Sequence, residues 1–379
     1  MASPVAPRSS NYFTTALCQA RVRWRPLCGL IALAVFVASL ISGCSPFYVM
    51  RAAYEEGKIL WRREPIADYL GKPDLVPDTG EKLRLVLEVR EYAKNVLKMN
   101  VGGSYSTYSY VDRPDLAFIV TAAPRTELKP YTWWFLFVGR VPYKGYFSKE
   151  DAEQAAAELQ TQGYDTNIRT TAAFSTLGWF DDPLMSHLLR YGKVTLAEII
   201  FHELLHSTLY VKGAGNFNES LANFVGGRAT IEFFRDKSGV GSAEYQQAIR
   251  AWQEELAFSE FIGDFAKSLS ELYRRDIPYE EKLRLRQGLF QKAKEDWSRH
   301  MGDRPRSRFR RFLEQPLNNA IIINYLLYFT DLKLFEAVYQ TKDENLVATI
   351  AAIRQAVEQG GDPFKQVQAL VDGDKTVSK

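Results

Sequence analysis

Residues 202–206 read His-Glu-Leu-Leu-His and lie inside a longer run, Thr195 to His206, that predicts a helix. Residues four apart on a helix lie on the same face, so the imidazoles of His202 and His206 can reach a single metal ion. Glu203 then projects beside that ion. The chain contains only four histidines, and two of them at this spacing around a glutamate are not expected by chance. The stretch therefore predicts a metal site on a helix.

The next segment of the chain offers a third ligand. A catalytic zinc ion normally takes three protein ligands and leaves a fourth position for water, so two histidines are one short. Gly213 and Gly215 predict a break after the first helix, and a second helix is expected to begin near residues 216–218. A short connection makes the two helices neighbours. Glu219, in the first turns of the second helix, can then face the two imidazoles.

Other residues compete for roles at this site. Glu198 lies four residues before His202 on the same helical stripe, and it could be a ligand or a hydrogen-bond partner of a ligand. We favour Glu219 as the third ligand because it lies in an Asn-Glu-x-x-Ala pattern. His187 and His300 are interpreted as structural residues.

With these residues in place, the stretch from Thr195 to Gly226 resembles a gluzincin metallopeptidase. The chain from Cys44 onward resembles the zinc aminopeptidases of Gram-negative bacteria. The resemblance implies a zinc ion bound by two histidines and one glutamate, and a second glutamate as general base. The matching residues are, as metal ligands, His202, His206 and Glu219, and, as catalytic base, Glu203.

Two departures from thermolysin accompany the resemblance. The spacing from the histidines to Glu219 is shorter, and Asn223 stands where an aspartate usually orients a histidine. An asparagine carbonyl can still accept a hydrogen bond from an imidazole N–H, although it raises the basicity of the ligand less than a carboxylate does. Further strings that look like the family, without a mechanism of their own, lie at 141–147, 178–183 and 318–320.

The resemblance implies hydrolysis of peptide bonds, with an aminopeptidase as the expected activity. A zinc endopeptidase of the cell envelope is the closest alternative. An envelope binding or assembly lipoprotein with a structural zinc is an alternative from another class, and such a protein has no use for Glu203.

An aminopeptidase must hold the substrate's α-ammonium group, for which the candidates are Asp181, Asp182 and Glu198. Gluzincins stabilise the oxyanion with a tyrosine, histidine or arginine, and the tyrosine candidates, among which the sequence does not choose, are Tyr143, Tyr210, Tyr325 and Tyr328.

The start of the chain resembles a bacterial lipoprotein signal. Three arginines precede an uncharged run from Leu27 to Ile41, which is followed by Ser42-Gly43-Cys44. Fifteen residues are fewer than the roughly twenty that a spanning helix needs, so the run predicts a cleaved signal. Residues 1–43 are then removed and Cys44 is lipidated, which provides stable membrane anchoring. The residue after Cys44 is Ser45 and not the aspartate that commonly retains lipoproteins in the inner membrane. The expected location is therefore the periplasmic face of the outer membrane. An uncleaved signal anchor and a cytoplasmic peptidase are the alternatives.

This cleavage changes the charge and the cysteine count. Residues 1–43 carry four arginines and no acidic residue, so their removal takes the net charge from +3 to −1. A nearly neutral protein offers no electrostatic basis for binding nucleic acid. Cys18 and Cys28 leave with the signal and Cys44 carries the lipid, so no disulfide is expected. The expected partners are a peptide or protein substrate and the membrane.

The order of predicted elements indicates an α+β fold. Strands at 116–122 and 131–138 and a β-α-β unit around the helix Lys149–Gln162 precede the metal-binding helices, and nearly everything after Ser242 is helical. We expect residues 44–379 to form one catalytic unit, with an α/β lobe at 44–194 and a helical metal-binding lobe at 195–379. In gluzincins the edge strand beside the metal helix binds the substrate backbone, and Arg169 to Gly178 is the candidate edge.

Overall fold

The computed structural model describes residue 54 and residues 57–112, 115–135, 139–171, 181–302 and 307–377. The expected signal, its cleavage site and Cys44 lie outside the described residues, as do residues 172–178 of the candidate edge segment. Within the described ranges, no helix is both long and apolar enough to cross a membrane. The described residues 132–141 belong to a small compact unit, and residues 57–131 and 142–377 belong to a larger one.

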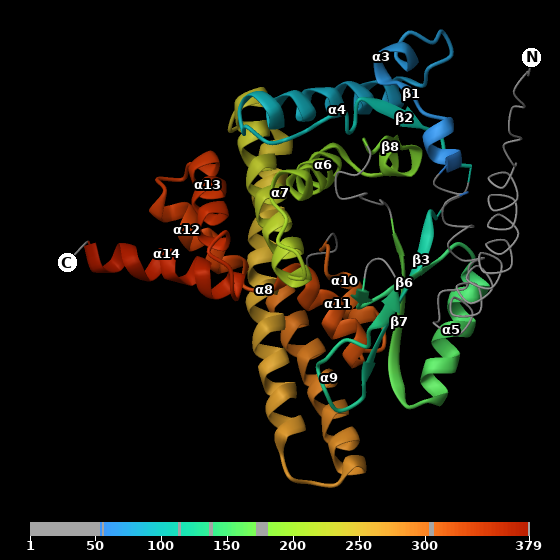
Figure 1. Ribbon diagram of the computed structural model, residues 1–379, viewed down its shortest axis with the longest axis vertical. Helices are drawn as coiled ribbons and strands as arrows, with labels where there is room; N and C mark the ends of the chain where they lie inside the picture. The colour runs from blue at the N-terminus through green and yellow to red at the C-terminus, as the bar shows by residue number, and fades with distance from the viewer. Residues whose placement is uncertain are drawn as a thin grey trace, which may run out of the picture. The chain divides into compact units, whose positions relative to one another are not determined.

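The fold is α+β, as the sequence predicts, with short strands before a long succession of helices (Figure 1). The small unit contains the hairpin of β4 (Trp133–Phe135) and β5 (Gly139–Val141). The N-terminal half of the larger unit contains β1 (Glu64–Pro65), α3 (Ile66–Tyr69), α4 (Pro77–Asn95), β2 (Thr107–Ser109), β3 (Ala117–Pro124), β6 (Lys144–Tyr146), α5 (Lys149–Thr161), β7 (Tyr164–Thr171), β8 (Leu184–Met185) and the 3-10 helix η1 (Ser186–Arg190).

The central sheet has the strand order β6-β3-β7, and both outer strands run antiparallel to β3. β6 and β7 are therefore parallel to each other, and α5 connects them across the inserted strand β3. The predicted helix and the strand after it are present, but the strand before the helix is β6 and not the predicted strand at 131–138, and β6 and β7 are not neighbours. Ser148 caps α5 by accepting a hydrogen bond from the Asp151 amide. A second small sheet has the order β1-β2-β8.

Helices make up the rest of the larger unit. They are α6 (Lys193–Thr208), α7 (Gly215–Ser238), α8 (Ala243–Arg274), α9 (Tyr279–Met301), α10 (Arg310–Glu314), α11 (Asn319–Phe329), α12 (Leu332–Thr341), α13 (Leu346–Val357) and α14 (Pro363–Val377). In Figure 1, α8 and α9 form a long antiparallel pair. Both α11 and α5 pack on β3 and β7, so a helix lies on each face of the central sheet.

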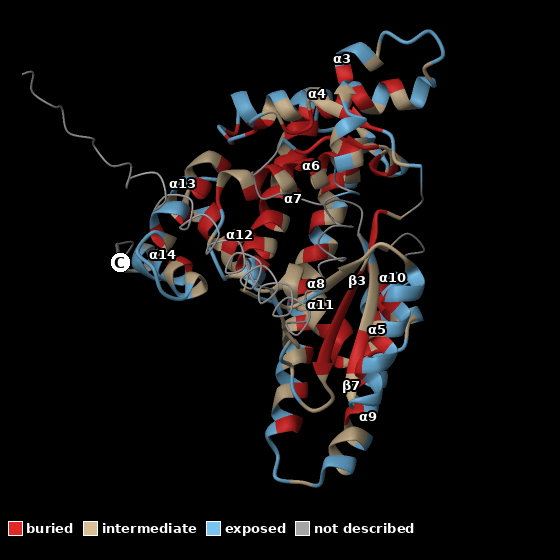
Figure 2. Cartoon of the chain, turned by 45° about the vertical axis from the view of Figure 1, so that its right-hand side comes forward, coloured by how far each residue is buried: buried red, intermediate tan, exposed pale blue. Residues whose placement is uncertain are grey.

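Helices α6 and α7 lie in the main hydrophobic core, which also receives side chains from α4, α8 and α12. Each is buried on several sides, and Figure 2 shows their turns mostly as buried or intermediate. Phe201 and Phe224 are fully buried on α6 and α7. A second core joins α8, α9, α10 and α11. The two helices that carry His202, His206 and Glu219 are thus held by packing from several directions.

Candidate metal centre

The loop between α6 and α7 sets the position of Glu219. The φ angle of Gly213 is +81°, which suits glycine, so the chain can turn sharply after α6. The Asn218 side chain then bonds both backbone groups of Val211: its Oδ1 accepts from the amide and its Nδ2 donates to the carbonyl, each at 2.8 Å. The asparagine of the Asn-Glu pattern thereby ties the first turn of α7 to the end of α6 and presents Glu219 toward the α6 histidines.

A glycine lets α7 approach α6 closely at the motif. A Cβ atom on Gly226 would lie 3.0 Å from the carbonyl oxygen of Glu198 and 3.4 Å from Cβ of His202. Any larger residue would therefore press on the backbone of α6 one turn before the first histidine. The neighbouring Gly227 is equally constrained on the other side, because its Cβ would come within 2.5 Å of the Trp252 ring on α8.

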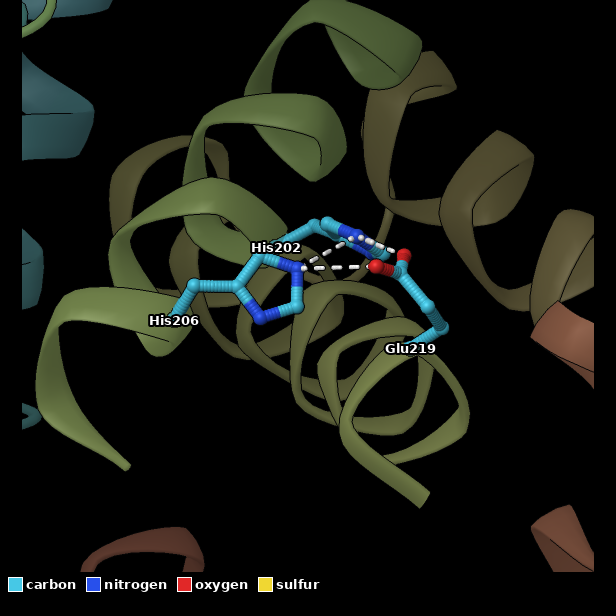
Figure 3. A group of neighbouring side chains, drawn as sticks. All are labelled: His202, His206 and Glu219. Carbon is cyan, nitrogen blue, oxygen red and sulfur yellow. Dashed lines mark hydrogen bonds and ion pairs between the residues drawn. The ribbon is translucent and has the colours of Figure 1, made fainter. Parts of the chain in front are cut away.

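The structure brings His202, His206 and Glu219 together, and their polar atoms point toward one another (Figure 3). The two Nε2 atoms are 3.2 Å apart. Oε2 of Glu219 lies 3.3 Å from Nε2 of His202, and Oε1 lies 3.7 Å from Nε2 of His206. One nitrogen from each imidazole and one carboxylate oxygen therefore converge within 4.8 Å, an arrangement that could hold a metal ion.

Burial and neighbouring charge act differently on the three groups. Burial and the charge of His202 lower the pKa of His206 to about 4. Burial also opposes the charged form of His202, but the hydrogen bond to Glu219 and the charges of Glu203 and Glu219 raise its pKa. Burial disfavours the Glu219 carboxylate, yet the hydrogen bond to His202 and the nearby positive charges lower its pKa. His206 is thus held neutral and Glu219 ionised, the forms that bind a metal ion.

Asn223 lies one turn after Glu219 and contacts His202. Its Nδ2 donates to the carbonyl oxygen of Tyr328 on α11 at 2.9 Å, which leaves its side-chain oxygen for the hydrogen bond to His202. That bond raises the pKa of His202. Asn223 therefore contacts a histidine of the group, and it also joins α7 to α11.

Glu203 is partly buried beside the same group. Burial and the charges of Glu219 and Asp182 raise its pKa to about 7, although His202 acts in the opposite direction. A carboxylate with a pKa near neutrality can accept and return a proton, which is what a general base does. The site therefore combines a group that could hold a metal with an adjacent proton acceptor.

A family model described as "Putative aminopeptidase" matches residues 47–363, most of the chain. The chain belongs to this family. No curated protein and no solved structure matches it at a significant level. The matched residues include both metal-motif helices, the central sheet and α11.

Glu198, the alternative ligand, pairs with an arginine instead. Arg308 donates to its carboxylate through both terminal nitrogens, at 2.7 Å from Nη1 to Oε1, and also bonds Glu255. Burial opposes ionisation of Glu198, but the Arg308 charge and hydrogen bonds lower its pKa. The carboxylate is not in the group formed by His202, His206 and Glu219. Its partner is an arginine, and the expectation of a ligand or a hydrogen-bond partner of His202 is not met.

The three carboxylates considered for an α-ammonium site have different partners. Oδ1 of Asp181 accepts from the Gly103 amide at 2.7 Å, and Glu198 pairs with Arg308. Asp182 is buried, and its charge raises the pKa of Glu203. Asp182 is therefore the one of the three whose carboxylate acts on the proposed base.

The tyrosine candidates divide between two parts of the larger unit. Tyr325 packs in the second core against Phe258 and accepts a hydrogen bond from Gln315. The Tyr328 ring instead lies 6.3 Å from the His202 ring, and the Tyr210 ring lies 6.3 Å from that of His206. The Glu219 charge raises the pKa of Tyr143, after burial, which places Tyr143 near the same group.

Two further residues beside the site were not predicted. Tyr105 is buried with a φ of +57°, and after burial the charges of Glu203 and Asp182 raise its pKa. The preceding Gly102-Gly103 signals a turn, but nothing in the sequence indicates that a tyrosine adopts the left-handed conformation. Arg169 on β7 donates from Nη2 to the Tyr328 hydroxyl at 3.2 Å. It lies at the start of the predicted edge segment, whose side chains the sequence did not assign.

The remaining two histidines lie away from the group. His187 is buried on η1, and His300 stacks on Trp297 near the end of α9, with ring centroids 5.0 Å apart. Neither belongs to the group that could hold a metal. The asparagines of the string at 318–320 are structural: Asn318 caps α11, and Asn319 bonds the carbonyl oxygens of Pro124 and Glu127.

Proposed function

We propose that this chain is a zinc-dependent aminopeptidase in which His202, His206 and Glu219 bind the metal and Glu203 is the general base. The convergence of two Nε2 atoms and a carboxylate from adjacent helices, with a proton acceptor beside them, carries the proposal. Two imidazoles and one carboxylate form one of the donor sets of catalytic zinc sites. Such sites keep a fourth position open, whereas structural zinc sites are usually closed by four protein ligands.

Zinc, when bound, supplies a Lewis acid that lowers the pKa of water and polarises a carbonyl group. The protein residues perform the proton transfers. Glu203 takes a proton from the attacking water while the oxygen atom of that water bonds to the carbonyl carbon of the peptide. It then gives this proton to the amide nitrogen as the C–N bond breaks, so the products are a carboxylic acid and an amine. Positioned groups of this kind contribute about 10²- to 10⁴-fold to the rate.

Two neighbouring residues suit the other needs of this reaction. Burial raises the pKa of Tyr328 to about 12, so its hydroxyl stays protonated at neutral pH and can donate to a developing oxyanion. Its oxygen already accepts from Arg169, which leaves its proton for another acceptor. Asp182, near Glu203, is our candidate for binding the α-ammonium group that distinguishes the substrate of an aminopeptidase.

The test is hydrolysis of matched peptides by the zinc-loaded protein from Ser45 onward, with Glu203→Gln alongside. One set of peptides has a free N-terminus, and its twin set is N-acetylated. We expect cleavage of the free-amine set only, and a loss of at least about 100-fold in kcat for Glu203→Gln at unchanged zinc content. Full activity in Glu203→Gln with zinc bound contradicts the assignment of the base.

The two alternatives give other results in the same assay. Cleavage of both peptide sets indicates an endopeptidase. Cleavage of neither set, in a protein that binds zinc tightly, favours an assembly lipoprotein with a structural metal, for which Glu203→Gln is silent. The partly buried Glu203, with its pKa of about 7, favours the enzyme, because a structural site has no use for such a group.

We also propose that the mature protein begins at Cys44 and is anchored by lipid to the periplasmic face of the outer membrane. The support is the sequence Ile41-Ser42-Gly43-Cys44 after an uncharged run. Labelling with a radioactive fatty acid should mark the wild-type protein and not Cys44→Ser. Globomycin, which blocks lipoprotein signal cleavage, should cause the precursor to accumulate. An unlabelled wild-type protein is inconsistent with a lipid anchor.

A further inference from the structure

Arg169 lies on the face of β7 that packs on α11. It is paired with Ile119 of β3, and Asn167 and Asp165 precede it at intervals of two residues, so the three share one face of the strand. Asp165 accepts a hydrogen bond from the Asn319 amide at the start of α11, and Arg169 reaches Tyr328 near the end of that helix.

The lengths of the two elements agree with this placement. Four strand residues span roughly 13 Å, and nine helix residues span about the same distance. Helix α11 therefore runs along β7, and the strand carries Arg169 to the end of the helix where Tyr328 lies beside His202. The edge strand and α11 together thus bring the guanidinium to the hydroxyl of Tyr328, whose ring lies 6.3 Å from that of His202.

Other arginines of the interior pair with a carboxylate, whereas Arg169 has no such partner among the described residues. Arg286 pairs with the buried Asp165, Arg228 with Glu336, and Arg308 with Glu198. Among the residues that the structure describes, no carboxylate lies within ion-pair distance of Arg169, and its buried Nε has no hydrogen-bond partner. Within the described ranges, the one hydrogen bond of its Nη2 goes to the neutral Tyr328 hydroxyl. A partly buried guanidinium in this state is stabilised by an incoming anion.

The charge of Arg169 also acts on the Glu219 carboxylate. In the proposed function Glu219 is a metal ligand, so its charge is directed to the ion. A substrate carboxylate is then the natural partner, because a guanidinium presents two parallel N–H groups in the geometry that a carboxylate accepts.

We propose that Arg169 binds a carboxylate of the peptide substrate, and that the protein therefore prefers short peptides in which a carboxylate lies close to the scissile bond. This inference rests on the proposed peptidase function. The carboxylate can be the C-terminus of a dipeptide or tripeptide, or an acidic side chain beside the cleaved bond.

Two pairs of peptides distinguish these sources. Trialanine and its C-terminal amide report on the terminal carboxylate, and Ala-Glu-amide and Ala-Gln-amide report on the side chain. We expect kcat/KM of the wild-type protein to favour the carboxylate by roughly 10- to 100-fold in at least one pair. Arg169→Gln should abolish this preference, and Arg169→Lys, which keeps the charge but not the paired N–H groups, should retain part of it.

Matched variants separate carboxylate binding from support of Tyr328. Tyr328→Phe removes the hydroxyl that Arg169 bonds but leaves the guanidinium, so the preference should persist although kcat falls. Arg284→Gln, at an exposed ion pair on α9, should behave as the wild type. Equal kcat/KM within both wild-type pairs overturns the proposal. So does an Arg169→Gln protein that is slower on all four peptides but keeps the preference.

A binding measurement separates this proposal from the peptidase proposal. Calorimetry with zinc-loaded Glu203→Gln should show roughly 10- to 100-fold tighter binding of the preferred carboxylate peptide than of its neutral twin, and Arg169→Gln in the same background should remove the difference. If no peptide is cleaved by the wild type but this difference is present, the peptidase proposal fails and carboxylate binding stands. If the twins bind equally, the inference about Arg169 fails whatever the activity.

Discussion

At the residue scale, Glu198 and Glu255 share Arg308 but hold different charges. Burial and the charge of Glu198 raise the pKa of Glu255 far above its ordinary value, whereas Arg308 keeps Glu198 ionised. Glu198→Gln removes the charge that Arg308 needs, so we expect it to lower the free energy of unfolding by about 3 kcal/mol at pH 7. Glu255→Gln replaces a protonated acid by a neutral amide, so its cost should be much smaller. Urea denaturation in the presence of a chelator measures both.

The pH dependence of the same pair has a definite sign. The folded-state pKa of Glu255 is raised, so the folded protein holds its proton while the unfolded chain releases it, and stability is lost as pH rises from about 4.5 toward the folded pKa. Glu255→Gln lacks this loss. Its stability relative to the wild type should therefore increase between pH 5 and pH 8, and a constant difference across that range contradicts a protonated Glu255.

At the scale of elements, the crossing of α6 and α7 decides whether three ligands can meet. A Cβ on Gly226 would lie 3.0 Å from the Glu198 carbonyl oxygen, a backbone atom that cannot rotate away. We expect Gly226→Ala to lower the free energy of unfolding by about 1–2 kcal/mol, because overpacking outweighs the gain in helix propensity. Separation of the helices should also weaken zinc binding, since Glu219 lies on α7 and both histidines lie on α6.

Gly288 provides the matched control on α9. A Cβ there would meet nothing within 4 Å, and the residue is exposed. Gly288→Ala should stabilise the protein by about 0.5–1 kcal/mol and leave zinc affinity unchanged. Chemical denaturation without metal and competition with a zinc chelator measure the two effects. If both variants behave alike, the close approach at Gly226 does not position the ligands.

The same crossing shows what the sequence could predict. The spacing of His202 and His206 predicts that both lie on one face of a helix, whereas Glu219 is chosen from the Asn-Glu-x-x-Ala pattern and the base role of Glu203 from the family resemblance. Arg169 joins the site from a strand, and its contact with Tyr328 bridges residues far apart in the chain. No periodic pattern in the local sequence predicts such a contact. Asn218 was recognised as part of a pattern, but its two bonds to Val211 became visible only in three dimensions.

At the scale of the whole molecule, packing and not the metal holds the two motif helices. Fully buried side chains on both helices, among them Phe201 and Phe224, place α6 and α7 in the main core with α4 and α12. Burial of large apolar side chains stabilises by roughly 1.5–3 kcal/mol each. The protein should therefore stay folded when the metal is removed, in contrast to small domains whose folding depends on zinc.

In the proposed function, zinc binds the folded arrangement of His202, His206 and Glu219 and not the dispersed residues of the unfolded chain, so it should nevertheless stabilise the protein. At a free zinc concentration about 1,000-fold above the Kd, the gain is about 4 kcal/mol. Chelation should lower Tm while the far-UV circular dichroism at 25 °C stays unchanged, and returned zinc should restore Tm. Glu219→Gln should show little of this shift. Loss of helical signal on chelation at 25 °C contradicts the prediction and favours the structural-zinc alternative, because a catalytic ion on a packed scaffold can leave without unfolding it.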